Sequence, residues 1–294
     1  MFSGYIFKPE PLTFFPYLVK TILQSLLLMW SVLLTRSAAG QAPGQPASMS
    51  CGTPAIETLL AAHPEMRARV AAIEAQTQRY IKEAGLEVNR LLPGPAAPLL
   101  VIPVVVHVIY GAADQNLSDA VIQNQIEELN LAFRGALSPG PNANPSVVPL
   151  PPAFASLVGD ARVQFCLATR TPSGTPTTGI TRRNNIGTQY AGGFGFNDQM
   201  KRTSTGGTDA WNTAHYLNIW CCDLGPGLYG FGVFPGTATY PGEDGIAMNY
   251  AAFGWGHAAL DPSYALGRVA VHEVGHWLRT CVTSGATPAA APTT

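Results

Sequence analysis

Hydrophobic residues gather in short runs of the kind that form buried strands. The first run, residues 99–110, is an almost continuous series of β-branched side chains, LLVIPVVVHVIY. Such a run is typical of a strand that is covered on both faces. Four later segments have the alternating or apolar composition of strands. They are ARVQFCLA, YLNIWCC, YGFGVFP and DGIAMNY, at residues 161–168, 216–222, 229–235 and 244–250.

Apolar residues three and four positions apart predict three helical regions. One lies near 56–84, where Pro64 is expected to begin the longer part. A second lies near 118–134, with Ser118 as its cap and Gly135 as its stop. The third is YALGRVAVHEVGHWL, residues 264–278, which has no internal proline. Strands alternating with helices predict an α/β fold.

The N-terminal part of the chain divides into a signal and a linker region. Residues 21–35 are apolar and of signal-peptide length, and the small residues of SAAGQA follow them. We therefore expect a signal peptide at residues 1–40, cleaved before Gln41; an uncleaved membrane anchor is the alternative. Residues 41–98 combine a Pro- and Gly-rich linker with the first helical region. That region is interpreted either as a removable pro-segment or as a structural element, which is a short coiled coil or a helix packed on the domain that follows.

Charge and cysteine content narrow the choice of partners. Only 12% of the residues are charged and the formal net charge is −1, which argues against a nucleic-acid partner. The five cysteines are an odd number, so in an exported protein at least one is free, binds metal or joins another chain. Cys166 on one strand and either Cys221 or Cys222 on another offer one structural disulfide; the remaining cysteines are Cys51 and Cys281.

The run His272, Glu273, Val274, Gly275, His276 carries the chemistry of the sequence. Residues four apart on a helix project side by side, so both imidazoles can bind one zinc ion. Glu273 lies between them and is placed to act as general base on a water that zinc activates. By contrast, His107 lies inside an apolar strand, where a hydrogen-bonded core residue is the more common role.

Most of residues 101–278 resemble the pappalysin/cytophagalysin family of metzincin zinc metallopeptidases. The resemblance is carried by IPVVVHVIY, LSDAVIQNQIEELNLAFRG, VQFCLATRTPSGTPTTGITR, YLNIWCCDLGPGLYGFGVFPG, DGIAMNYAAFG and YALGRVAVHEVGHWL. It implies the upper subdomain of a metzincin: a twisted mixed β-sheet with a backing helix and an active-site helix, preceded by a helical pro-segment. It further implies a secreted pro-enzyme with Zn²⁺, and with Ca²⁺ as a second metal. Its catalytic domain would occupy residues 99–294.

The resemblance ends after Leu278. In the family the helix continues as HExxHxxGxxH, but here the glycine position holds Arg279 and the third-histidine position holds Val282. Cys281 is the one remaining metal-ligating side chain after His276, and its spacing is foreign to the family. We therefore expect a domain that is incomplete at its C-terminus, through truncation or a frameshift. The family also implies that Cys51 is a candidate pro-segment switch on the zinc; a disulfide partner or an idle thiol is the alternative.

Two functions remain open at this point. The first is a secreted zinc-dependent endopeptidase that acts on proteins or peptides and that is inactive as this chain. The second is a non-catalytic secreted protein that binds extended peptides along the edge strand LYGFGVFPG. Neither involves a membrane once the signal is removed. The sequence does not define the oligomeric state.

Overall fold

The computed structural model describes residues 50–83, 99–135, 153, 159–185, 189–190 and 198–279. Its α-helices are α2 (Ile56–Ala62), α3 (Met66–Glu83), α4 (Asp119–Phe133) and α5 (Arg268–Trp277). Its strands are β1 (Ser50–Cys51), β2 (Leu100–Tyr110), β3 (Val163–Leu167), β4 (Ile180–Asn184), β5 (Leu217–Cys222), β6 (Leu228–Gly232) and β7 (Ile246–Asn249). Short 3-10 helices lie at η3 (Ala113–Gln115), η5 (Gln199–Lys201), η6 (Thr203–Thr205), η7 (Pro241–Glu243), η8 (Tyr250–Ala252) and η9 (Pro262–Tyr264).

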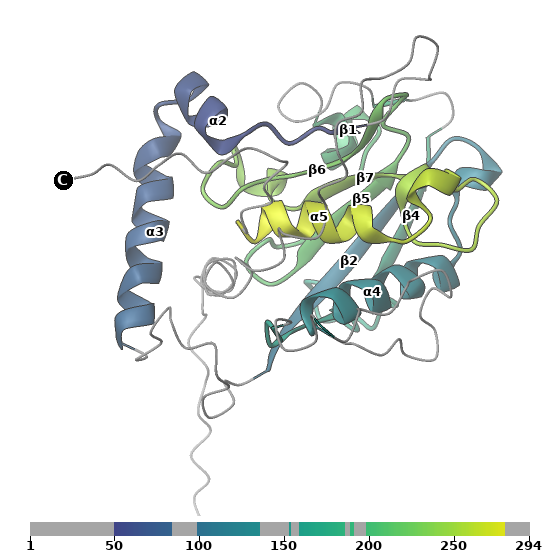
Figure 1. Cartoon of the computed structure of the whole chain (residues 1–294). Helices are drawn as coiled ribbons and strands as arrows, with labels where there is room; N and C mark the ends of the chain where they lie inside the picture. The colour runs from purple at the N-terminus through teal and green to yellow at the C-terminus, as the bar shows by residue number, and fades with distance from the viewer. Residues whose placement is uncertain are drawn as a thin grey trace, which may run out of the picture.

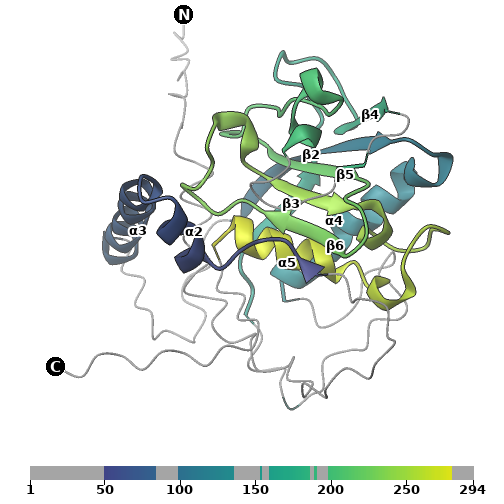
Figure 2. The same ribbon diagram turned by 90° about the horizontal axis from the view of Figure 1, so that it is seen from above.

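The strands form one mixed sheet in the order β1-β6-β7-β5-β2-β3. Strand β2 is long enough to pair with β3 along its first half and with β4 along its second. All pairings are parallel except that of β6 with β7. The predicted α/β fold, a mixed sheet with helices packed on it, is therefore confirmed. Figure 1 shows α4 and α5 in front of the sheet, and Figure 2 shows from above that both cover the same face.

The two faces of the sheet pack into two separate cores. Val104, Val106 and Val108 of β2 point toward α4 and α5 and belong to the larger core. Ile109 points the opposite way and belongs to the second core, together with Trp220 and Phe231. Both faces of the central strands are thus covered, which explains why they read as continuous apolar runs.

The segment before the sheet shares the second core. Leu59 of α2 and Met66 of α3 are buried in it. Helix α3 also lies directly against the turn that follows β6, because a Cβ atom on Gly236 would stand 2.9 Å from Cδ1 of Ile73. Arg69 Nη1 donates a hydrogen bond to the carbonyl oxygen of Ala238 at 3.0 Å in the same region. Residues 50–83 are therefore packed against the sheet domain.

Several sequence expectations need correction. Strands β1 and β4 were not expected, because two residues and the polar stretch ITRRN carry no apolar pattern. The disulfide is wrong: the described cysteines 51, 166, 221 and 222 are all free. Cys166 pairs with Pro103 and Cys221 with Val108, on opposite sides of β2, so another strand separates them. Cysteine 281 and the expected signal peptide lie outside the described residues, and no helix within those residues is long and apolar enough to span a membrane.

His107 is a core residue, as its sequence position suggested. It is fully buried, with Nδ1 at 2.8 Å from Thr181 Oγ1 and Nε2 at 3.1 Å from Asn218 Oδ1. Burial lowers its pKa from 6.5 to about 4. In the unfolded chain its pKa returns to about 6.5, so between the two values the unfolded state binds more protons. The contribution of His107 to the free energy of unfolding is therefore complete above pH 6.5. It declines by about 3 kcal/mol as the pH falls toward 4.

This linkage predicts that part of the pH dependence of the free energy of unfolding is lost when the His107 imidazole is replaced. We expect the free energy of unfolding of His107→Gln to be lower than that of the wild type at pH 7, since the polar contacts are perturbed. Between pH 7 and pH 4 it should fall by about 3 kcal/mol less than that of the wild type. Urea unfolding at several pH values measures both profiles, and parallel profiles would contradict the assignment.

Candidate metal centre

Helix α5 carries the HEVGH run, and its start is anchored by α4. The helix begins after Gly267, which has φ 67° and acts as its N-cap. The buried side chain of Gln125 donates from Nε2 to the Gly267 carbonyl at 2.9 Å and accepts at Oε1 from the Gly254 amide at 2.7 Å. Arg268 in the first turn pairs through Nε with buried Glu128 at 2.7 Å. These contacts fix where the helix begins relative to the sheet.

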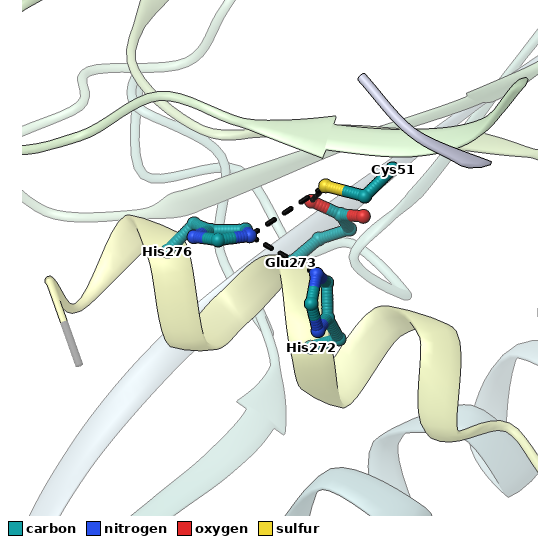
Figure 3. A group of neighbouring side chains, drawn as sticks. All are labelled: Cys51, His272, Glu273 and His276. Carbon is teal, nitrogen blue, oxygen red and sulfur yellow. Dashed lines mark hydrogen bonds between the residues drawn. The ribbon is translucent and has the colours of Figure 1, made fainter. Parts of the chain in front are cut away.

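Four side chains meet on the face of α5 that lies beside β1 and β6. One ligand atom each from Cys51, His272, Glu273 and His276 lies within 4.8 Å of all the others. Nε2 of His276 is 3.0 Å from Nε2 of His272 and 3.5 Å from Sγ of Cys51. Sγ of Cys51 is also 3.5 Å from Oε2 of Glu273. Figure 3 shows the sulfur and both imidazoles turned toward a common point.

These separations suit a zinc ion. With Zn–N distances of about 2.0–2.1 Å and Zn–S of about 2.3 Å, tetrahedral geometry places two nitrogens about 3.3 Å apart and nitrogen and sulfur about 3.6 Å apart. The Nε2–Nε2 distance of 3.0 Å and the Nε2–Sγ distance of 3.5 Å are close to both values. One sulfur and two imidazole nitrogens are also a donor set that zinc accepts. The residues present therefore fit the metal.

The protonation state of the two imidazoles favours metal binding, whereas that of the Cys51 thiol opposes it. Burial, and then the neighbouring His272, lower the pKa of His276 to about 3, and burial lowers that of His272. Both imidazoles are therefore neutral at pH 7, which is the form that binds a metal. Burial raises the pKa of Glu273 to about 8, although hydrogen bonds from Cys51 and Thr53 oppose the rise. Burial, and then the charge of Glu273, raise the pKa of Cys51 to about 12.

Helix α5 approaches β6 closely because that strand carries glycine at alternate positions. A Cβ atom on Gly232 would stand 2.5 Å from the carbonyl oxygen of Glu273 and 3.1 Å from Cβ of His276. A Cβ atom on Gly230 would stand 3.1 Å from Cγ of Glu273. Both glycines therefore leave the space that the turn of the helix with Glu273 and His276 occupies. The pattern of YGFGVFP predicts this strand, but it does not explain the two glycines.

The end of α5 corrects one sequence argument. Arg279 stands where the family has glycine, and from the sequence we expect an arginine to disfavour the bend that glycine allows there. The chain nevertheless takes the left-handed conformation there, with φ 57° at Arg279. The amide of Arg279 donates to the carbonyl of His276, and that of Leu278 to the carbonyl of Val274, both at 2.8 Å. Arg279 Nη1 lies 3.5 Å from Glu74 Oε2 of helix α3, which links this bend to residues 50–83.

The structure brings together most of the candidate residues from the sequence. His272, Glu273 and His276 lie on one turn of α5, and Cys51 reaches them from β1 although 221 to 225 positions separate it from that turn. Cys281, the weak candidate for a third ligand, lies outside the described residues. Sequence reasoning missed Thr53, whose hydroxyl contacts Glu273. Its position two residues after Cys51 was the available signal.

Comparisons with known proteins find similarity to solved metallopeptidase structures. No protein-family model matches the sequence, and no curated protein matches it either. Among solved structures, a mutant of promirolysin from Tannerella forsythia is similar, with 38% identity and a TM-score of 0.61. The match covers 78% of this chain and 68% of that one. Mature mirolysin of T. forsythia, bound to a cleaved peptide, is similar with 42% identity, a TM-score of 0.53 and 62% of this chain covered.

A second mirolysin structure, in complex with a compound, is similar to this chain to the same degree. It shares 42% identity with this chain, with a TM-score of 0.54 over 62% of this chain. This chain spans 63% and 64% of the two mirolysin chains in these complexes, which is less than two thirds of their length.

The glycine packing predicts a specific effect of Gly232→Ala. The added methyl group would push against the backbone of Glu273 and Cβ of His276, so helix and strand must separate. We expect a loss of about 1–3 kcal/mol in the free energy of unfolding and weaker zinc binding. Gly242→Ala is the matched control, because its methyl group would meet mainly the ring of Tyr240. Equal thermal stability and zinc affinity for both variants would show that close packing at Gly232 is unimportant.

Proposed function

The chain belongs to the pappalysin family of metzincin metallopeptidases, to which mirolysin belongs, and we propose that it is a zinc-dependent endopeptidase by family that is inactive as this chain. One observation carries this proposal: the two histidines and the glutamate of the HEVGH run converge with Cys51 on a single buried point. A helix with HExxH at a random surface position would not place a thiol there. The family supplies the reaction class, peptide-bond hydrolysis.

His272, His276 and Cys51 are the residues that would hold the metal. Zinc, when bound, polarises the scissile carbonyl and lowers the pKa of a water molecule. Glu273 lies in the centre of the same helix turn and is completely buried. It would accept a proton from that water and transfer it to the leaving amine.

We propose residues 41–98 as a pro-segment, with Cys51 as the group that blocks the metal. The match with promirolysin covers 78% of this chain, whereas that with mature mirolysin covers 62%, which supports a pro-segment in the additional part. Cys51 reaches the histidines from β1, which pairs with β6 at the edge of the sheet. A thiol in that place excludes a substrate from the metal.

Strand β6 is the proposed binding edge for substrates. It pairs with β7 on one side and with β1 on the other, so removal of β1 frees its second edge. An extended peptide can add to such an edge through main-chain hydrogen bonds. Mature mirolysin has been solved with a cleaved peptide, which supports peptide substrates for this chain. Export through the expected signal at residues 1–40 completes the proposal of a secreted enzyme.

The third histidine of the family motif is absent from this sequence. Position 282 is valine, so the described ligands are two histidines from α5 and one cysteine from β1. Two histidines alone hold zinc weakly. We therefore propose that Cys51 serves as the third protein ligand in this chain and that displacement of Cys51 does not leave an active centre.

Zinc binding tests this ligand set. The wild-type chain should bind one zinc ion, measured by competition with a chromophoric chelator. His276→Ala and Cys51→Ser should each weaken binding by roughly tenfold or more, because each removes a ligand. Glu273→Ala is the control and should retain one zinc ion per chain. With cobalt in place of zinc, a thiolate-to-metal charge-transfer band should be present in the wild type and absent in Cys51→Ser. Zinc binding that is indifferent to His276→Ala would overturn the site.

Activity gives a second test. We expect the 294-residue chain to cleave a denatured protein substrate little or not at all, since Cys51 blocks the metal and Val282 supplies no ligand. Cleavage that is robust, that chelators stop and that Glu273→Ala abolishes would contradict this expectation. Peptide binding that persists unchanged after zinc removal would instead favour the non-catalytic binding protein.

A further inference from the structure

Thr53 contacts the general base and the edge strand at the same time. Its hydroxyl oxygen accepts a hydrogen bond from the Gly232 amide at 2.8 Å. The same Oγ1 lies 3.2 Å from Oε2 of Glu273 and 3.4 Å from the Gly232 carbonyl oxygen, and the hydroxyl proton can be donated to either. The Glu273 carboxyl is the nearer acceptor. A single side chain therefore joins the strand edge to the base.

The local sequence explains why the Thr53 side chain, and not the backbone, bonds to the Gly232 amide. Strand β1 pairs with β6 in parallel, with Cys51 opposite Gly230, and the Gly52 amide donates to the Gly230 carbonyl at 2.8 Å. Two residues later comes Pro54, which has no amide hydrogen for a ladder bond. The Thr53 hydroxyl bonds to the Gly232 amide where the backbone ladder ends. The edge of β6 is thereby covered beyond the last main-chain contact.

Metal binding would make this contact more important for Glu273. The carboxyl oxygen Oε2 has two neighbours that can donate, the Cys51 thiol at 3.5 Å and the Thr53 hydroxyl at 3.2 Å. A cysteine that binds zinc does so as a thiolate, which has no proton to donate. Thr53 then remains as the donor to Oε2 among these contacts. The second carboxyl oxygen, Oε1, is buried without a hydrogen-bond partner in the described part of the chain.

We propose that Thr53 is a second, metal-independent inhibitory contact of the pro-segment. Its hydroxyl donates a hydrogen bond to the Glu273 carboxyl, which would accept a proton from water. It also accepts a hydrogen bond from the Gly232 amide, which would bind an incoming peptide. Cys51 blocks the metal, whereas Thr53 blocks the base and the strand edge two residues later. This inference rests on the proposed function, since it takes Glu273 as the base and residues 41–98 as the pro-segment.

Amide hydrogen exchange of the metal-free, 294-residue chain tests this inference. The Gly52 amide reports docking of β1, because its acceptor is the Gly230 carbonyl. Thr53→Val keeps the shape but removes the hydroxyl, and it should speed Gly52 exchange by about tenfold or more, as expected for loss of the two hydrogen bonds that the hydroxyl forms with Gly232 and Glu273. Thr53→Ser retains the hydroxyl and should stay within about threefold of the wild type. Amides of β2 and β5 serve as internal controls and should not change.

A double-mutant cycle shows whether Thr53 acts on the base. In the Glu273→Ala background one of its partners is absent, so Thr53→Val should accelerate Gly52 exchange by a clearly smaller factor than in the wild type. An equal factor in both backgrounds would overturn the contact with the base. Gly52 exchange within twofold of the wild type in Thr53→Val would overturn the inference as a whole, as would equal acceleration by Thr53→Ser.

These measurements separate the inference from the proposed function. They use no zinc and no substrate, so a failure to bind zinc would remove the enzyme proposal and leave the exchange results standing. Zinc binding through Cys51 combined with unchanged exchange in Thr53→Val would leave the enzyme proposal intact and remove only the second contact.

Discussion

Direct contact between helix α5 and strand β6 is the constraint on which the rest of the site depends. Gly230 and Gly232 carry no side chains where β6 meets the helix, and a methyl group at either position would collide with Glu273 or its neighbours. The helix can therefore lie close enough for Glu273 to reach the strand edge. The same approach allows a third chain segment, β1, to bring Cys51 and Thr53 within hydrogen-bond distance of Glu273. The short distance between the backbones of α5 and β6 thus determines which side chains contact Glu273.

This closeness has an electrostatic cost. Glu273 is buried, and its pKa is raised to about 8, while the pKa of His276 is lowered to about 3. Both shifts mean that the folded protein disfavours charge at this point when no cation compensates it. A divalent cation would favour the carboxylate and the thiolate and would use the imidazoles in the neutral form that burial already selects. Metal binding and the docking of β1 should therefore stabilise each other.

Local sequence patterns were sufficient for the elements whose side chains are buried in a regular way. The apolar run of β2, the capped stripe of α4 and the i, i+4 histidines of α5 were all predicted in place. Strand β4 has the polar sequence ITRRN and forms because β2 is long enough to offer it a free edge. Strand β1 is two residues long, and its pairing with Gly230 depends on a contact across about 180 positions that no local pattern records. The predicted disulfide was wrong for the same reason, because the local sequence does not show that β2 lies between the two cysteine-bearing strands.

Under the proposed function, Cys51 would combine two roles that otherwise oppose each other, that of a group blocking the metal and that of a metal ligand. In a centre with three histidines, a switch cysteine is an addition, and its departure leaves a complete ligand set. In this sequence position 282 is valine, so departure of Cys51 would leave His272, Glu273 and His276 of the described group, of which the two histidines are the proposed ligands. A pair of histidines binds zinc weakly, so the segment that blocks the centre would also be the segment that retains the metal. Removal of the pro-segment would then release zinc instead of exposing it to substrate.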